Sequence, residues 1–525
     1  MSMNLPSHLH TTLLAGVART PLTKDFGLTG GAESLQNSLN DAATETSLWQ
    51  AIAVHDIWQR AGFIPANADA LPAAEADERT CPRAAEQTLS LLLRGLHPNL
   101  LESWLQQAQS HGFRLPHTHL PAMLDLGVQK ASLRAALIPL LDRRGSWLVA
   151  QNPVWAERYG VAGEDTDSQW NLGNQAERTH ALRVMRARDP TNALAALHAD
   201  WTNESPEDRA IFLPCLEVNL SLNDEAFLEN ALDDKRKEVR TQAQTLLAAL
   251  PNSQLATRCI ERLAPLMSYK KRLLIGAQME VTLPEACDKA MTRDGIGMQA
   301  QPKLGEKAGW LRDLISRVPP AHWSHSWSIT PTDVIALMGK QEFSLALLGG
   351  VIEASMRGVQ LASSADNVEW YCALLCELVF GKIKLDAPVN LMTVFGSLPR
   401  ASQEDLVQRW LADSDSRWDA NNNIVDWIRQ AANAASAPWP TSISHQIITR
   451  MQSGMLASPE NHWRLRSALK DLAGVLDVGT TDYFDANWPT ADWQYWPQWR
   501  TNIDDFLATL RFRHTMQRSF METSA

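Results

Sequence analysis

The sequence predicts an all-α protein in which antiparallel helix pairs stack into an α-solenoid, a superhelix of helical repeats. Apolar side chains recur at helical spacing through most of the 525 residues. No stretch combines sustained strand-type alternation with the turn residues of a β-hairpin. Residues 221–251 carry two apolar stripes joined by a short polar turn, the pattern of two helices packed against each other. We therefore expect repeated helix pairs, each burying one face against its neighbours in the stack.

The helix pair in residues 221–251 begins with a capping signal. Ser221 precedes Asp224 by three positions, so their side chains can accept hydrogen bonds from the free N–H groups of a first turn. Asp233 or Asp234 is expected to cap the second helix, and Pro251 to end it, because proline has no N–H to donate. The two stripes consist of Phe227, Leu228, Ala231 and Leu232, and of Val239, Ala243, Leu246, Leu247 and Leu250.

The order of residues before the second stripe, two aspartates and then a basic run, resembles the second helix of a HEAT repeat. This similarity predicts a HEAT/armadillo-like α-solenoid with units of roughly 35 to 45 residues. The helical stripe is expected to continue from Ser253 to Leu274 as part of the next unit. The alternative is an ordinary helical hairpin inside a globular domain, which the same two stripes would also fit.

Interruptions of the helical pattern divide the chain into five predicted segments. Residues 1–63 form an N-terminal helical segment, and residues 64–84, rich in proline, alanine and acidic side chains, form a linker. Residues 85–291 hold the HEAT-like repeats. The glycine-rich range 292–309 is expected to act as a hinge between two halves, and residues 310–525 to form a tryptophan-rich C-terminal helical region.

The composition predicts a cytoplasmic protein. The net charge of -11 argues against a general binder of polyanions. Six cysteines are scattered without a CxxC pair, which is typical of buried thiols in a reducing compartment. No basic region precedes the short apolar patch near the N-terminus, and the apolar runs are about half the length of a membrane span. The twenty tryptophans are interpreted first as wedges packed between helices.

The sequence holds no recognisable catalytic motif. A phosphate loop, a GxSxG nucleophile elbow and an HExxH zinc helix are all absent from it. The tight histidine pairs lack the further ligands that a metal site needs. We therefore expect a protein that is not an enzyme and that carries no cofactor and no metal.

A locally basic segment, residues 229–272, suggests an alternative function. It contains nine lysines and arginines against five acidic residues. A basic ridge on helical repeats can follow a nucleic-acid backbone, so the alternative is a nucleic-acid-binding protein that uses residues 235–272. The candidate contacts are Lys235, Arg236, Lys237 and Arg240. Pairing with acids of neighbouring units is the other interpretation, and the overall acidity of the chain favours it.

Three stretches carry a family resemblance: LGEKAGWLRDLISRVPPAHW at 304–323, RGSWLVAQNPVW at 144–155, and the helix pair at 221–251. Together they resemble an uncharacterised bacterial family of HEAT-like helical proteins, from about residue 90 onward. Its members are typically encoded near a MoxR-type AAA ATPase, a von Willebrand A-domain protein and a SWIM zinc-finger protein. The positions that fit the family pattern are Gly305, Trp310, Leu311, Pro319, Pro320 and Trp323.

The resemblance implies an accessory or adaptor role beside an ATPase, and it supplies no catalytic residue. Combined with the helical pattern, it predicts a non-enzymatic scaffold that binds a MoxR-type AAA ATPase or a von Willebrand A-domain protein. Trp310 and Trp323 are candidate contact residues, because large aromatic side chains supply much of the energy of protein interfaces. The alternative for both is a packing role in a helix–turn wedge.

Overall fold

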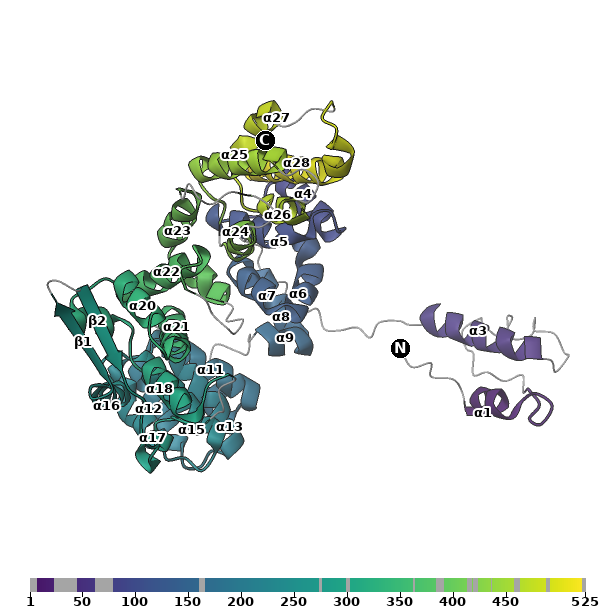
Figure 1. The fold of residues 1–525 in the computed structure, drawn as a ribbon. Coiled ribbons are helices and arrows are strands. Elements are labelled where there is room, and N and C mark those ends of the chain that lie inside the picture. Colours follow the sequence, from purple (N-terminus) through teal and green to yellow (C-terminus); the bar gives the residue numbers. More distant parts are fainter. Residues whose placement is uncertain are drawn as a thin grey trace. The chain divides into compact units, whose positions relative to one another are not determined.

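The computed structural model describes residues 7–22, 45–61, 79–159, 166–272, 276–298, 303–361, 364–383, 391–412, 418, 424–435, 437–457, 463–487 and 492–521. The chain divides into two compact units, Met1–Ala74 and Glu75–Ala525, called the N-terminal unit and the main unit. The described residues are mainly α-helical, with one pair of strands (Figure 1). No described helix is both long enough and apolar enough to cross a bilayer.

The N-terminal unit contains helices α1 (Ser7–Ala15) and α3 (Glu45–Ala61), which contact each other. Its small core consists of Leu9 from α1 and of Leu48, Ala51 and Ile52 from α3. These three residues of α3 lie at helical spacing and therefore share one face.

The helices of the main unit follow in chain order. The first group is α4 (Arg83–Leu93), η1 (Pro98–Leu100), α5 (Leu101–Ser110), η2 (His117–His119), α6 (Leu120–Gln129), α7 (Ala131–Leu137), η3 (Ile138–Leu140), α8 (Arg143–Gln151) and α9 (Pro153–Tyr159). The second group is α10 (Thr166–Leu172), α11 (Gln175–Arg188), α12 (Pro190–Asp200), α13 (Pro206–Phe212), η4 (Leu213–Glu217), η5 (Leu222–Asp224), α14 (Glu225–Ala231), α15 (Lys237–Ala249), α16 (Gln254–Leu263) and α17 (Lys289–Arg293).

The remaining helices among the described residues of the main unit follow. They are α18 (Glu306–Ser316), α19 (Ala321–Trp327), α20 (Pro331–Gly339), α21 (Ser344–Leu361), α22 (Ala365–Val379), η6 (Leu391–Ser397), α23 (Arg400–Ala412), α24 (Ile424–Ala434), α25 (Thr441–Ala457), α26 (Trp463–Leu472), η7 (Val478–Thr480), α27 (Thr481–Asn487) and α28 (Trp496–Ser519).

The predicted helix pair in residues 221–251 is confirmed. Ser221 and Asp224 form a capping box at the start of η5, and α14 and α15 contact each other. All nine residues of the two predicted stripes are buried. The chain leaves α15 at Leu250, directly before Pro251. The predicted cap of the second helix is wrong: Arg236 occupies the cap position without a side-chain bond, and Asp234 accepts a hydrogen bond from the N–H of Arg236.

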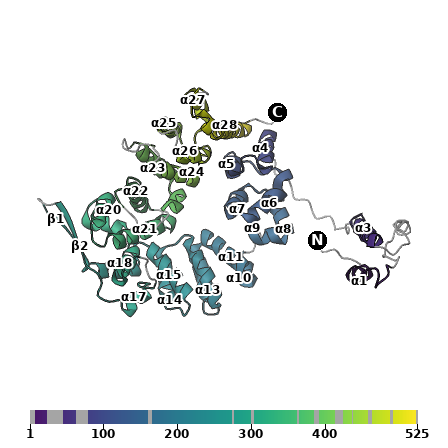
Figure 2. The ribbon, with the colours of Figure 1, turned by 45° about the vertical axis from the view of Figure 1, so that its right-hand side comes forward.

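A β-hairpin corrects the prediction of an all-α chain. Strands β1 (Met267–Arg272) and β2 (Gly276–Val281) pair antiparallel, from Met267 opposite Val281 to Arg272 opposite Gly276. Both views show the hairpin beside α20, which contacts β2 (Figures 1 and 2). The predicted helical stripe is therefore wrong beyond α16. The alternation that marks a strand is confined in β1 to two apolar positions, Met267, which is buried, and Tyr269, which stacks on Trp327.

Most of the main unit shares one hydrophobic core, which runs from Trp170 to Leu510. A second core lies among α4 to α9 and also includes Met516 and Phe520. The end of the chain therefore returns to the first helices of the main unit, where α28 contacts α4 (Figures 1 and 2). The rings of Phe520 and Trp104 lie 5.2 Å apart.

Part of the range predicted as a hinge is closely packed. Ile296 and Asp294 are buried, and Ile296 belongs to the larger core. Gly295 has a φ of +83°, and a Cβ atom there would lie 2.6 Å from Oε1 of Gln244. Glycine is required at this position both by the backbone conformation and by the close approach of α15. The division into five segments stays a prediction, although the boundary between the two compact units at residue 74 lies within its linker range.

Helices α18 and α21 approach each other closely at Gly350. A Cβ atom at this position would lie 2.7 Å from the backbone oxygen of Arg312 and 2.8 Å from Cβ of Ile315. We expect Gly350→Ala to lower the free energy of unfolding by about 1–3 kcal/mol, because a helix backbone cannot move aside cheaply. Urea unfolding followed by tryptophan fluorescence measures this loss.

Gly339, the last residue of α20, provides the matched control. The Cβ of Gly339→Ala would meet only Cγ2 of Ile383, at an ordinary 3.7 Å. This variant should be neutral or stabilising by up to about 1 kcal/mol, because alanine restricts the unfolded chain. Equal stability of the two variants would contradict the close approach of α18 and α21.

Candidate functional site

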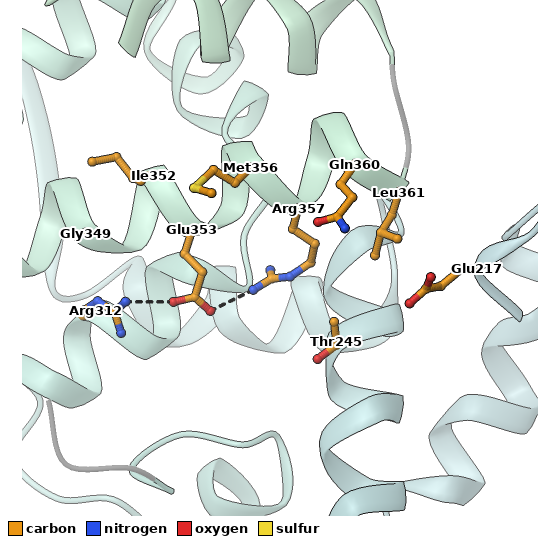
Figure 3. Close-up of a pocket in the computed structure, with 10 residues that line it drawn as sticks. All are labelled: Glu217, Thr245, Arg312, Gly349, Ile352, Glu353, Met356, Arg357, Gln360 and Leu361. Atoms are coloured by element: carbon orange, nitrogen blue, oxygen red, sulfur yellow. Dashed lines mark hydrogen bonds and ion pairs between the residues drawn. The ribbon is translucent and has the colours of Figure 1, made fainter. Parts of the chain in front are cut away.

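A pocket of about 390 Å³ lies where η4, α15, α18 and α21 meet (Figure 3). Its volume falls within the range typical of ligand pockets. Helix α21 supplies most of the lining, α18 supplies one arginine, and α15 and η4 complete the wall. The lining residues are Glu217, Thr245, Arg312, Gly349, Ile352, Glu353, Met356, Arg357, Gln360 and Leu361.

The sequence of α21 places polar side chains on the pocket side of the helix. Glu353, Arg357 and Gln360 follow one another at spacings of four and three, so they share a face. Leu347 and Val351 are buried on another face and fix the rotation of the helix. The polar face of an otherwise apolar helix therefore lines the hollow (Figure 3).

One carboxylate in the pocket serves two guanidinium groups. Nη2 of Arg312 lies 3.0 Å from Oε2 of Glu353, and Nη2 of Arg357 donates a hydrogen bond of 2.9 Å to Oε1 of the same side chain. Figure 3 shows Glu353 between the two arginines. Arg357 also donates through Nη1 to the backbone oxygen of Ser316, at 2.6 Å. Only 12% of the Arg357 side chain is exposed, against 40% for Glu353.

The charged groups at and behind the pocket wall influence one another's pKa values. Burial lowers the pKa of Arg357 to about 10; Glu353 opposes this shift, whereas Arg317 adds to it. The hydrogen bonds of Arg317 go to carbonyl and hydroxyl oxygens of residues 294, 295, 313 and 316. Burial, together with the charge of Glu353, raises the pKa of Asp313, against the hydrogen bond from Gly297 and the nearby arginines. The cluster thus joins three guanidinium groups to two carboxyl groups.

This arrangement is suited to recognition. A guanidinium group offers five N–H donors in a fixed plane and stays charged at neutral pH, so it binds carboxylate and phosphate groups strongly. Ile352, Met356 and Leu361 add an apolar wall. The pocket therefore combines donors for an oxyanion with a surface for an apolar group.

A larger hollow of about 650 Å³ lies where η1, α5 and α7 face α24, α26 and α28. His97 at its edge has a φ of +49°, and its Nδ1 lies 3.2 Å from the hydroxyl of Thr509. The charged residues of its lining are Glu102, Lys130, Lys470, Asp471 and Asp505. Because charges of both signs mix there, this hollow presents no concentrated charge to a ligand.

The six residues predicted to bind a partner do not line either hollow. Lys235 and Lys237 are exposed, whereas Arg236 pairs with Glu207 and Glu238. Arg240 donates to the backbone oxygens of residues 234 and 235, so it serves the turn before α15.

The two tryptophans predicted as contact residues have packing roles. Trp323 is buried, with 4% of its surface exposed, and its ring lies 5.3 Å from that of Trp327. Trp310 is half-buried, and its indole Nε1 lies against Gly297, 2.9 Å from where a Cβ would be. Both side chains therefore make packing contacts within the chain, and their role in binding a partner stays a prediction.

Arginines of the basic segment are paired inside the protein. Nη2 of Arg258 lies 2.6 Å from Oδ1 of Asp294 and 3.0 Å from Oε1 of Glu229, and Nη1 of Arg262 lies 2.5 Å from Oδ2 of Asp294. Asp294 belongs to the turn after α17. It lies 36 residues after Arg258 and 32 residues after Arg262. Ion pairing with acids elsewhere in the chain, the second interpretation of the basic segment, is therefore present at Arg236, Arg258 and Arg262.

The prediction of buried free thiols is confirmed for Cys81, Cys215, Cys259 and Cys372, and all six cysteines are free. Burial raises the pKa of Cys259 to about 11 and that of Cys81 to about 12. Such thiols are poor nucleophiles, because the thiolate is the reactive form. Among the described residues, no three His, Cys, Asp or Glu side chains are placed to hold a metal ion.

The fold and the pocket define a mainly helical protein with a pocket lined in part by two arginines and two glutamates. The chain belongs to DUF5691, a family of unknown function, whose family model matches residues 8–520. No curated protein and no solved structure matches the chain significantly.

Proposed function

We propose that the protein is a non-enzymatic adaptor that binds a partner protein through the pocket on α15, α18 and α21. The observation that carries this proposal is the sharing of Glu353 between Arg312 and Arg357 in an open pocket. Guanidinium groups beside an apolar wall are typical of protein interfaces, where arginine is enriched among the residues that contribute most energy.

We also propose that the main unit is a HEAT-like α-solenoid. Support comes from helices that contact their neighbours along the chain, such as α11 with α12, α14 with α15, α15 with α16, and α21 with α22. In a solenoid each repeat packs mainly against the repeats before and after it. Such arrays present long surfaces for partner proteins, which agrees with an adaptor role.

The proposed partner is a MoxR-type AAA ATPase, with a von Willebrand A-domain protein as the second choice. This part of the proposal rests on the resemblance of residues 304–323 to proteins encoded beside such ATPases. In the proposal the adaptor works in the cytoplasm, where its six free thiols stay reduced.

Complex formation with the ATPase tests the proposal. The purified chain and a MoxR-type ATPase from the same genome are mixed at micromolar concentration and separated by size-exclusion chromatography with light scattering. We expect a stoichiometric complex. We further expect Arg312→Glu to weaken it about tenfold or more, the factor for losing one charge-assisted hydrogen bond.

Arg400→Glu is the matched control. Arg400 pairs with Glu404 on α23 and is not part of the pocket lining. This variant should form the complex as the unmodified chain does. Failure of the unmodified chain to bind either the ATPase or the von Willebrand A-domain protein would contradict the adaptor role.

A further inference from the structure

The pocket lining holds two guanidinium groups, those of Arg312 and Arg357, and two carboxylates, those of Glu353 and Glu217. Both guanidinium groups pair with Glu353, whereas Glu217 lies on the η4 side of the pocket (Figure 3). A charge removed from water is stable only if it is paired and hydrogen-bonded. Because two guanidinium groups share the single carboxylate of Glu353, the carboxylate of a ligand could serve as a further partner for them.

The hydrogen bonds of the two lining arginines leave donors for a ligand. Arg357 donates through Nη1 to Ser316 and through Nη2 to Glu353, and Arg312 uses Nη2 for Glu353. Each guanidinium has five N–H groups, so N–H groups remain on both side chains. An oxyanion with two or more oxygens could accept from both arginines at once.

Glu353 is placed as a replaceable counter-ion. Its side chain is 40% exposed, so it can rotate into solvent more easily than Arg357, of which only 12% is exposed. Gly349, one turn before it on α21, brings the helix close to Arg312: a Cβ there would lie 3.0 Å from Nε. Glycine at this position keeps the arginine beside the mouth of the pocket.

We infer that this pocket recognises an acidic segment of a partner protein, in which a Glu or Asp carboxylate bridges Arg312 and Arg357 in place of Glu353. The neighbouring apolar side chain of that segment, such as leucine, packs on Ile352, Met356 and Leu361. This inference rests on the proposed function and names the chemistry of the segment that binds.

A peptide-binding experiment on the full chain tests the inference. The probe is acetyl-Leu-Glu-Leu-Glu-Leu-amide, and the control peptide carries glutamine in place of glutamate. Isothermal titration should show that the glutamate peptide binds about tenfold or more tightly than the glutamine peptide, as expected for a charge-assisted contact. Inorganic phosphate should compete with it, because guanidinium groups bind both oxyanions.

Two variants give opposite results if the inference holds. Arg312→Gln should weaken binding of the glutamate peptide about tenfold or more. Glu353→Gln should strengthen it, because it removes the internal competitor; a gain in affinity cannot come from a misfolded chain. Glu404→Gln on α23 removes an equivalent carboxylate of an i,i+4 pair and should change nothing.

Equal binding of the two peptides, or weaker binding after Glu353→Gln, would overturn the inference. If the chain forms its complex with the ATPase while the glutamate peptide does not bind, the adaptor role stands and only the chemistry assigned to the pocket is wrong.

Discussion

Asp224→Asn should destabilise the protein by about 3–5 kcal/mol, the cost of leaving one member of a buried ion pair without its partner. Asp224 and Arg186 are almost completely buried, at 1% and 0% exposure. Nη1 and Nη2 of Arg186 lie 2.8 and 3.0 Å from the two carboxylate oxygens of Asp224. Removing the carboxylate charge leaves a guanidinium in the core with no opposite charge.

The surroundings of Arg186 explain why this residue cannot simply turn away. It donates to the backbone oxygens of Val218, Pro190, Leu216 and Asn219, in addition to Asp224. These bonds join the end of α11 to the start of α12, to η4 and to the turn between η4 and η5. Asp224→Asn should therefore weaken the packing between two successive helix pairs. We expect it to lower the free energy of unfolding more than the loss of any exposed ion pair does.

Urea unfolding followed by tryptophan fluorescence measures this effect. The matched control is Asp405→Asn on α23, whose carboxylate lies 2.7 Å from Arg409 while both side chains are more than half exposed. Exposed pairs contribute about 0–1 kcal/mol, so this variant should unfold nearly as the unmodified protein does. Similar stability of the two variants would show that the Arg186–Asp224 pair is not buried as described.

Local signals in the sequence predicted the helix pair but not this ion pair. The capping box of Ser221 and Asp224 depends on residues three positions apart, and the apolar stripes depend on spacings of three and four. Arg186 lies 38 residues before Asp224. No local rule links the two, because their contact exists only after α11 has packed against the following helices.

The same limit explains why the arginine-lined pocket was not predicted. Glu353 and Arg357 are four residues apart, a spacing found in many exposed helix pairs, so it marks no site by itself. The third member, Arg312, comes from a different helix. The burial of Arg357 and the sharing of one carboxylate by two arginines arise only from tertiary packing. The sequence predicted contacts in the locally basic segment instead, and arginines of that segment pair with acids from elsewhere in the chain.

Asp294 should make the stability of the protein depend on pH in the acidic range. Its side chain is 1% exposed and accepts hydrogen bonds from Arg258 and Arg262. Burial alone would raise the pKa of Asp294, but the hydrogen bonds and charges of the two arginines outweigh it and hold the pKa below the ordinary 3.8. In the unfolded chain the pKa of an aspartate is about 3.9.

The sign of the effect follows from this difference. Because the folded protein binds the proton of Asp294 more weakly than the unfolded chain does, the ionised carboxylate stabilises the fold at pH values above about 4. This contribution is lost as the pH falls through the lower pKa of the folded state. Asp294→Asn cannot ionise, so it lacks the contribution at every pH and leaves Arg258 and Arg262 without their shared partner.

We expect Asp294→Asn to be about 3–5 kcal/mol less stable than the unmodified protein at pH 7, and this gap to narrow below about pH 4. Urea unfolding of both proteins at a series of pH values measures the gap, and contributions from other carboxylates cancel in the difference. Glu280→Gln is the control, since Glu280 is 65% exposed and pairs with an exposed lysine. The difference in stability between this variant and the unmodified protein should stay small at every pH. A gap for Asp294→Asn that is constant down to about pH 2 would mean that the pKa of this carboxyl is the same in the folded and the unfolded protein, and would contradict the lowered pKa of Asp294.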